Sequence, residues 1–318
     1  MDTTRFVIGY GHGISAVDSG YVRPQLDAIH LIVENGRAAV IDTATQHAVP
    51  RILAALAAKG LPPEAVDYVI LTHIHLDHAG GAGSLMRALP NAKLTVHPRG
   101  VRHMADPAKL IAGTVAVYGE AQTRALYGEI LPVPEGRIIA TPDGMQLSLA
   151  GRVLTFHETP GHARHHVVVH DERSRRVFAG DTFGLSYREL DEGDRQFLFP
   201  TTSPVQFEPE PYHRSIELIA SLAEDAVYLT HYSELRRPRE RVDDLHRLID
   251  AHAALALRAR NAGSQREKHL FEGVRALLLE EAHRYGSRLS DEEVMAVYGT
   301  DVELNAQGLG VWLDAQTA

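Results

Sequence analysis

The sequence contains no cysteine among its 318 residues. Disulfide bonds, thiolate metal ligands and a cysteine nucleophile are therefore excluded. The sequence also lacks a basic N-terminal stretch followed by an apolar run, and no apolar segment is long enough to span a membrane. We therefore expect a cytoplasmic protein that does not act in a membrane.

Positive charge is also scarce. The chain has 32 Lys and Arg against 41 Asp and Glu, which gives a net charge of -9. Binding along a nucleic-acid backbone requires clustered Lys and Arg, so we expect no nucleic-acid partner. Histidine, in contrast, is abundant at 19 residues. This abundance prompts a search for the spacing of metal ligands.

The first half of the chain alternates predicted strands and helices. Residues 28–33 and 38–41 are β-type runs joined by an Asn-Gly turn, which is a strong hairpin signal. Residues 49–59 have helical spacing, and the apolar run 67–71 favours a buried strand. A further strand is expected at 93–97 and a mostly helical segment at 107–127.

The middle of the chain turns to β structure. Two hairpins are predicted, one from residues 145–149 and 153–157 and the other from residues 167–170 and 176–179. Residues 182–211 show little periodicity and are interpreted as a long functional loop. A helix at 211–223 and a last strand at 226–229 follow.

The pattern beyond this strand becomes helical. Ser290 and Glu293 form the signature of a capping box. The helices are expected at 242–260, 270–285 and 291–297. We therefore expect an α/β domain at 1–235 and a helical C-terminal extension at 236–318. Residues 303–309 either fold back over the site or form a subunit contact, which leaves a homodimer open.

The densest chemical signal is a His-x-His-x-Asp-His string made by His73, His75, Asp77 and His78. It directly follows the predicted strand 67–71, and α/β proteins place their sites at the carboxyl ends of strands. On an extended backbone His73 and His75 point the same way. Four ligands from so short a loop cannot easily surround one tetrahedral ion, so the string predicts two adjacent metal ions.

Three further ligand-type side chains occupy matching places. His162, Asp181 and His231 each follow a predicted strand. Each signal is weak by itself, because a lone histidine at a strand end is more often structural. Together with the first motif, these side chains complete two coordination shells.

In order and approximate spacing, these seven residues resemble the metallo-β-lactamase superfamily over about residues 29–232. The local sequence is similar to that of glyoxalase II and the quorum-quenching lactonases, most clearly at Gly180-Asp181-Thr182 and around the histidine string. The resemblance implies an α/β fold, the αββα sandwich of that superfamily, here followed by the helical extension.

The resemblance also implies roles for the residues. One metal would be held by His73, His75 and His162, the other by Asp77, His78 and His231, and Asp181 would bridge both. A hydroxide between the metals would attack the substrate carbonyl, with Asp77 also serving as a proton shuttle. Asp42 matches a position that supports the site, although it could equally be a strand-end cap.

Other side chains near these motifs have two interpretations each. His165 and His166 either support the ligands or are partly exposed residues at a strand start. His12 lies between two glycines and is a weaker candidate. The aromatic residues expected to line a substrate pocket, or to pack the loop onto the core, are Phe183, Tyr187, Phe197, Phe199, Phe207 and Tyr212. If several contact the substrate, it is a small molecule with an apolar portion.

The sequence therefore predicts a hydrolase with two zinc ions that acts on a carboxyl ester, thioester or lactone. His and carboxylate ligands also suit iron or manganese. Three other functions remain open: an iron-dependent dioxygenase of sulfur compounds with one metal, a phosphodiesterase, and a ligand-binding or regulatory protein with little turnover. The acidic charge disfavours the phosphodiesterase.

Overall fold

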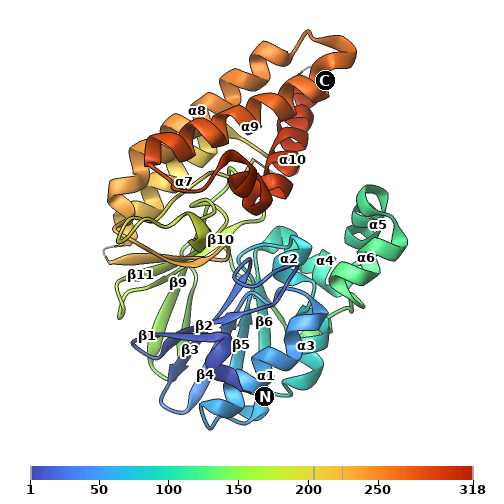
Figure 1. Ribbon diagram of the computed structural model, residues 1–318. Coiled ribbons are helices and arrows are strands. Elements are labelled where there is room, and N and C mark those ends of the chain that lie inside the picture. Colours follow the sequence, from blue (N-terminus) through green and yellow to red (C-terminus); the bar gives the residue numbers. More distant parts are fainter. Residues whose placement is uncertain (1, 203–204, 224, 317–318) are drawn as a thin grey trace.

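Two β-sheets lie face to face between layers of helices in the computed structural model, which describes residues 2–202, 205–223 and 225–316. Figure 1 shows α1 and α3 against the first sheet, and α7 with the C-terminal helices beside the second. This is the predicted αββα sandwich with a helical C-terminal part.

The first sheet combines an antiparallel half and a parallel half. Its strands are, in spatial order, β1 (Val7–Gly11), β2 (Ile14–Asp18), β3 (Ala28–Glu34), β4 (Arg37–Ile41), β5 (Val66–Ile70), β6 (Lys93–Val96) and β7 (Ile138–Ala140). β1 to β4 form an antiparallel meander, and β4 to β7 are parallel. The strands predicted in this sheet are confirmed, whereas β1, β2 and β7 were not predicted.

The second sheet is antiparallel apart from one pair of strands. Its spatial order is β13 (Ser233–Arg236), β12 (Ala226–Leu229), β11 (Arg176–Gly180), β10 (Val167–Asp171), β9 (Arg152–Glu158) and β8 (Gln146–Leu149). β11 and β12 are parallel. The prediction that 226–229 is the last strand is wrong, because β13 pairs with β12 beyond it.

The helices of the first 223 residues lie mostly on the outer faces. They are α1 (Val49–Ala58), α2 (Leu76–Ala79), α3 (Ala82–Ala88), α4 (Val101–Ala105), α5 (Ala108–Tyr118), α6 (Glu120–Tyr127) and α7 (Pro209–Leu222). Gly119, with φ of 77°, separates α5 from α6 where the sequence predicted one helical segment. The segment between β11 and α7 is largely irregular, as predicted, apart from the 3₁₀ turn Arg188–Leu190 and a bridge between Leu185 and Phe199.

Three clusters of buried side chains reveal the layers. Ile52 and Leu85 belong to a cluster under α1 and α3, and Phe156 belongs to the cluster between the two sheets. A third cluster joins the second sheet to α7 and to the C-terminal helices, with Ile216 among its members. Burial of these apolar faces drives the sandwich together.

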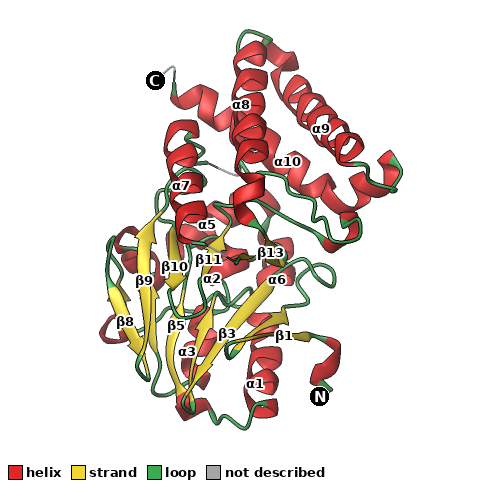
Figure 2. Ribbon diagram, turned by 90° about the vertical axis from the view of Figure 1, so that its left-hand side faces the viewer, coloured by secondary structure: helices red, strands yellow, loops and turns green. Residues whose placement is uncertain are grey.

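The C-terminal helices are α8 (Val242–Ala259), α9 (Arg266–Tyr285) and α10 (Asp291–Ala315), which Figure 2 shows grouped at one end of the molecule. The capping box of Ser290 and Glu293 is confirmed at the start of α10. α10 runs far beyond the predicted end at 297 and includes residues 303–309. The division of the chain at 235 stays a prediction. None of the described helices is long and apolar enough to cross a membrane.

Candidate metal centre

The predicted ligands come together along one edge of the sandwich. His73 and His75 follow β5, and Asp77 and His78 lie on the short helix α2. His162 lies in the β9–β10 connection. Asp181 follows β11, and His231 follows β12, so segments far apart in sequence meet here. A backbone hydrogen bond of 2.7 Å from the Ala28 N–H to the Thr230 carbonyl joins the two sheets at this edge.

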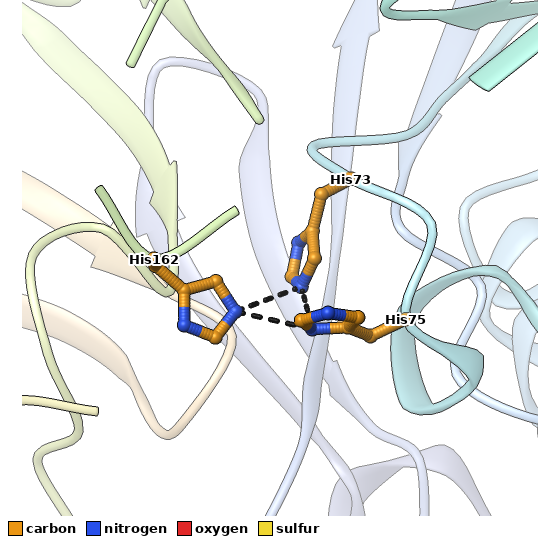
Figure 3. Close-up of side chains that lie close together, drawn as sticks. All are labelled: His73, His75 and His162. Carbon is orange, nitrogen blue, oxygen red and sulfur yellow. Dashed lines mark hydrogen bonds between the residues drawn. The ribbon is translucent and has the colours of Figure 1, made fainter. Parts of the chain in front are cut away.

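Three imidazoles form the first group of ligand atoms. Figure 3 shows His73, His75 and His162 converging, and each pair of facing nitrogens lies within hydrogen-bond distance. His73 Nε2 lies 2.8 Å from His75 Nδ1, and His162 Nε2 lies 3.3 and 3.1 Å from these two atoms. A tetrahedral zinc ion with Zn–N bonds of about 2.0–2.1 Å would separate its nitrogens by roughly 3.4 Å. A small outward shift of the rings would therefore fit such an ion.

Asp77, His78 and His231 form the second group. Asp77 Oδ2 lies 3.6 Å from His78 Nε2 and 3.5 Å from His231 Nε2. Within this group, as within the first, the ligand atoms all lie within 4.8 Å of one another. A third such arrangement, made by His73, His78 and Asp181, overlaps both groups.

Asp181 stands between the two groups. Its Oδ2 lies 3.5 Å from His162 Nε2 in the first group. Its Oδ1 lies 3.3 Å from His78 Nε2 and 3.6 Å from His231 Nε2 in the second. One carboxylate therefore faces both groups, one oxygen to each.

Several buried atoms in this cluster lack an ordinary hydrogen bond. His78 Nε2 and Asp181 Oδ1 are buried and have no hydrogen-bond partner among the described residues. Leaving a buried polar group unpaired costs about 1–3 kcal/mol. A metal ion between these atoms would satisfy both, so the donor set fits a resident metal.

Asp42 accepts hydrogen bonds that hold the ligands in place. The backbone N–H of Thr72 donates to it at 2.9 Å, and the hydroxyls of Thr72 and Thr230 each donate at 2.9 Å. His78 Nδ1 donates to Asp42 Oδ2, also at 2.9 Å. This bond fixes the His78 tautomer so that its Nε2 lone pair faces the centre. Asp42 thus contacts a predicted ligand and the residues preceding two of them, and its role as a support for the site stays a prediction.

His166 holds the backbone of Asp181. The Asp181 N–H donates to His166 Nε2 at 3.2 Å, and His166 Nδ1 lies 2.8 Å from the Thr159 hydroxyl. A Cβ at Gly180 would lie 2.6 Å from His166 Nε2, so only glycine permits this approach. His165 stacks on His73, with ring centroids 6.1 Å apart, and burial lowers the pKa of His165 to about 3.

Asp27 plays a similar part for His231, and sequence reasoning missed it. Its Oδ1 lies 2.9 Å from His231 Nδ1, and the Leu26 carbonyl lies 3.1 Å from the same nitrogen. Burial raises the pKa of Asp27 to about 6, against the attraction of His231. The only local signal was an acidic residue directly before a predicted strand, which does not reveal a partner at residue 231.

The electrostatic balance of the cluster favours a cation. Burial alone would raise the pKa of Asp181, but the attraction of His78 and His231 outweighs it and holds that pKa well below its usual range. Asp77 behaves in the same way, with its pKa lowered by His78 and His231. Burial and neighbouring histidines lower the pKa of His73 well below its ordinary value. The same carboxylates outweigh burial at His78 and His231 and raise the pKa of both rings well above its ordinary value, so a metal ion in the second group would displace a proton from each ring.

The predicted pocket aromatics divide into two kinds. The rings of Phe183 and Phe199 are fully buried in the hydrophobic cluster below the C-terminal helices, like those of Phe197 and Phe207, so they pack the loop onto the core. Tyr212 donates from its hydroxyl to the Asp181 carbonyl at 3.2 Å. The Tyr187 ring lies 6.2 Å from that of His231.

Other tyrosines approach the site without a sequence signal. Burial raises the pKa of Tyr21, Tyr127 and Tyr118, and the Asp77 carboxylate raises it further in each case. Tyr21 donates to the Tyr127 hydroxyl at 3.2 Å. Glu303 of α10 also raises the pKa of Tyr118. The three tyrosines, from the β2–β3 loop, α5 and α6, therefore lie close enough to Asp77 for its carboxylate to affect their pKa.

Asp301 of α10 adds a carboxyl group to this region. The Tyr187 hydroxyl donates to Asp301 Oδ1 at 3.3 Å, and the guanidinium of Arg23 lies 4.5 Å above the Tyr187 ring. Burial raises the pKa of Asp301 to about 7, although His231 opposes the shift.

His12 does not join the site. It is exposed in the β1–β2 turn, where the Gly13 carbonyl accepts from the Val33 N–H at 2.9 Å. This turn lies beside the β3–β4 hairpin, at the end of the sheet opposite Asp42. The glycines that flank His12 therefore serve the turn.

A family model described as the Metallo-beta-lactamase superfamily matches residues 28–231 of the sequence. The chain belongs to this superfamily. The matched segment begins in β3 and ends at His231, so it contains every predicted ligand.

Individual relatives in the metallo-β-lactamase superfamily are distant. The uncharacterized protein YobT of Bacillus subtilis is 28% identical over 67% of this chain and 86% of its own length. A hydroxyacylglutathione hydrolase of Klebsiella pneumoniae is 28% identical over 55% of this chain, and the match spans only 55% of that enzyme. A metallo-beta-lactamase family protein of Thermus thermophilus has a similar structure, with a TM-score of 0.65 and 21% identity over 96% of this chain and 94% of that one. The last comparison shows a shared fold that includes the C-terminal helices.

Proposed function

We propose that this superfamily member is a metal-dependent hydrolase of a carboxyl ester, thioester or lactone, with a centre for two metal ions. The observation that carries the proposal is the position of Asp181, whose two oxygens face two separate groups of ligand atoms. A site for one ion has no need of the second group. The similarity to a protein named hydroxyacylglutathione hydrolase supports hydrolysis of an acyl bond.

The ligand assignment follows the two groups. One ion would be held by His73, His75 and His162, the other by Asp77, His78 and His231, and Asp181 would contact both. Zinc is the first choice, because this ligand set suits it and nothing in the site indicates redox chemistry. Iron and manganese are the alternatives. Bound ions would supply an activated water and would polarise the substrate carbonyl.

The protein side chains would orient the ligands and move protons. Asp42 and Asp27 hold the outer nitrogens of His78 and His231, so the inner nitrogens keep a fixed direction. The Asp77 side chain is 27% exposed, against 6% for Asp181. Asp77 is therefore the carboxylate that substrate and solvent can reach, and we assign it the proton-shuttle role.

The approach to Asp77 supports a small substrate with an apolar portion. The partly exposed ring of Tyr21 packs against the buried ring of Tyr127, with centroids 5.9 Å apart, so Tyr21 offers an apolar face to such a substrate. We further propose that the protein works in the cytoplasm, because a chain without cysteine needs no oxidising compartment. The net charge of -9 argues against a nucleic-acid partner. The homodimer stays a prediction.

The proposal is tested with zinc-loaded protein and a panel of one aryl ester, one thioester and one lactone. We expect turnover of at least one class, and Asp181→Asn should lower kcat/KM by about 1000-fold or more, because it removes the charge shared by both ion positions. Asp243→Asn makes the same substitution at an exposed position on α8 and should keep wild-type activity.

Two outcomes would overturn the hydrolase. Full metal occupancy without turnover of any of the three substrates would favour a binding or regulatory protein. One equivalent of iron, together with oxygen uptake on a sulfur compound, would favour the dioxygenase.

A further inference from the structure

A second pair of facing histidines lies far along the chain from the ligands described above. His213 is on α7 and His246 is on α8, where these two helices pack against each other. Their ring centroids are 4.7 Å apart, and the two Nδ1 atoms are only 2.6 Å apart.

The outer nitrogens of both rings are committed to carboxylates. His213 Nε2 lies 3.0 Å from Asp250 Oδ1, and His246 Nε2 lies 2.9 Å from Glu217 Oε1. An ionised carboxylate only accepts hydrogen bonds, so both Nε2 atoms must carry the proton. In two neutral rings both Nδ1 atoms are then bare acceptors that face each other.

Two lone pairs at this separation repel unless a cation lies between them. The cation is either a proton, which makes one ring an imidazolium, or a metal ion bound to both Nδ1 atoms. A histidine that donates its outer N–H to a carboxylate and turns its other nitrogen inward is the common arrangement around metals. Here both rings have this arrangement.

We propose that His213 and His246 bind a divalent transition-metal ion of the zinc or copper type through their Nδ1 atoms, at a site separate from the hydrolase centre. Imidazole nitrogens suit these metals. The two side chains are 22% and 23% exposed, and they line an open surface groove together with Glu210 and Arg214. Water can therefore complete the coordination. With Glu217 and Asp250 also present, acidic groups outnumber the single arginine and attract a cation.

The ion would link two parts of the molecule. α7 covers the second sheet, and its Tyr212 donates to the carbonyl of Asp181. α8 begins the helical C-terminal part. A metal at His213 and His246 would therefore fasten the C-terminal helices to the helix that contacts the hydrolase centre, and it would stabilise the folded state by linkage.

The experiment measures zinc stoichiometry by calorimetric titration and elemental analysis on the metal-stripped full chain. Wild type is compared with His213→Gln and with His246→Gln. The matched control is His283→Gln, because His283 on α9 also contacts a carboxylate, Asp291 at 2.8 Å, but no imidazole of the described residues faces it. Either test variant alone decides the result if the other fails to fold.

We expect wild type and the control to bind one equivalent of zinc more than either test variant. The same excess of zinc should raise the Tm of wild type and control further than that of the test variants. Equal stoichiometry in all four proteins would overturn the proposal and leave a shared proton as the cation. This difference between variants does not depend on hydrolase activity, so failure of the hydrolase proposal would not affect it.

Discussion

The two clusters of facing histidines differ chiefly in burial. His73, His78 and His162 are inaccessible to solvent at the edge where the sheets meet, whereas His213 and His246 lie in an open groove. In the buried cluster, fixed neighbours such as Asp42 and Asp27 orient the rings, and unpaired atoms cannot turn to water. In the exposed cluster the carboxylates are themselves largely solvated. Histidines and carboxylates should therefore bind metal tightly for catalysis in the buried cluster, and bind it more weakly, in a structural role, in the groove.

The sharpest contrast is expected from truncating one ligand in each cluster. His162→Ala removes a nitrogen that lies within 3.5 Å of His73, His75 and Asp181, so kcat/KM should fall by about 1000-fold or more. His213→Ala should leave kcat/KM within about twofold of wild type. Steady-state kinetics on the substrate class that the panel identifies would measure both. A comparable loss in both variants would break the distinction between the clusters.

The next contrast is with a buried histidine whose ring is bonded to a backbone carbonyl and not to a carboxylate. His252 on α8 is buried, donates from Nδ1 to the Leu248 carbonyl at 2.7 Å, and has its pKa lowered to about 4 by burial. Its unfolded pKa is about 6.5, so the unfolded chain binds the proton first as pH falls. The neutral His252 side chain makes its full contribution to the free energy of unfolding above about pH 6.5. This contribution is lost as the pH falls through about 4. The difference corresponds to about 3 kcal/mol.

Denaturant titrations between about pH 7 and about pH 4 would measure this effect. Wild type should lose about 3 kcal/mol more of its free energy of unfolding than His252→Leu over this range. His269→Leu on α9 is the matched control, because His269 is exposed, and its pH dependence should follow wild type. Parallel curves for wild type and His252→Leu would refute the assignment.

A smaller effect is expected at the support of the buried cluster. Asp42→Asn keeps the size of the side chain but removes the charge that accepts from His78, Thr72 and Thr230. Metal affinity should fall about 10- to 100-fold, as it does when such supporting groups are lost elsewhere. Competition with a zinc chelator would measure the change. At the exposed pair Asp250→Asn should weaken zinc binding less, because that carboxylate is largely solvated. An equal loss of zinc affinity at both sites would show that burial of the supporting carboxylate does not determine how much it contributes to metal binding.

The smallest predicted effect concerns Tyr187. Tyr187→Phe removes the hydroxyl that donates to Asp301 beside the centre, but it removes no ligand. We expect kcat to fall a few-fold, about 1 kcal/mol, with metal content unchanged. Unchanged kinetics would mean that the hydroxyl has no role in turnover.

The parts of the fold and site that were predictable are encoded locally. β3, β4 and β5 are apolar runs bounded by turn residues, and the ligands follow strands directly in sequence. β1 escaped prediction because Gly9 and Gly11 interrupt its alternation, and β2 because its five residues are all buried and include the polar Ser15 and Asp18. α10 was predicted too short because Gly299 and later glycines interrupt its helical pattern.

The residues that were missed act across the fold. Asp27 reaches His231 from a distant, earlier part of the chain, and Asp301 reaches Tyr187 from the C-terminal helix. Nothing in the neighbouring residues of either aspartate encodes that partner. For the phenylalanines of the long loop the sequence left two interpretations open, and their burial favours packing onto the core.

The central claim is that the buried cluster holds two metal ions. Elemental analysis of His213→Gln, beside the same protein with His75→Ala added, tests it most directly, since the surface pair cannot contribute to the count. About two equivalents of zinc in the first protein and a clear loss in the second are the predicted result. No bound metal in either protein under metal-replete conditions would contradict the account.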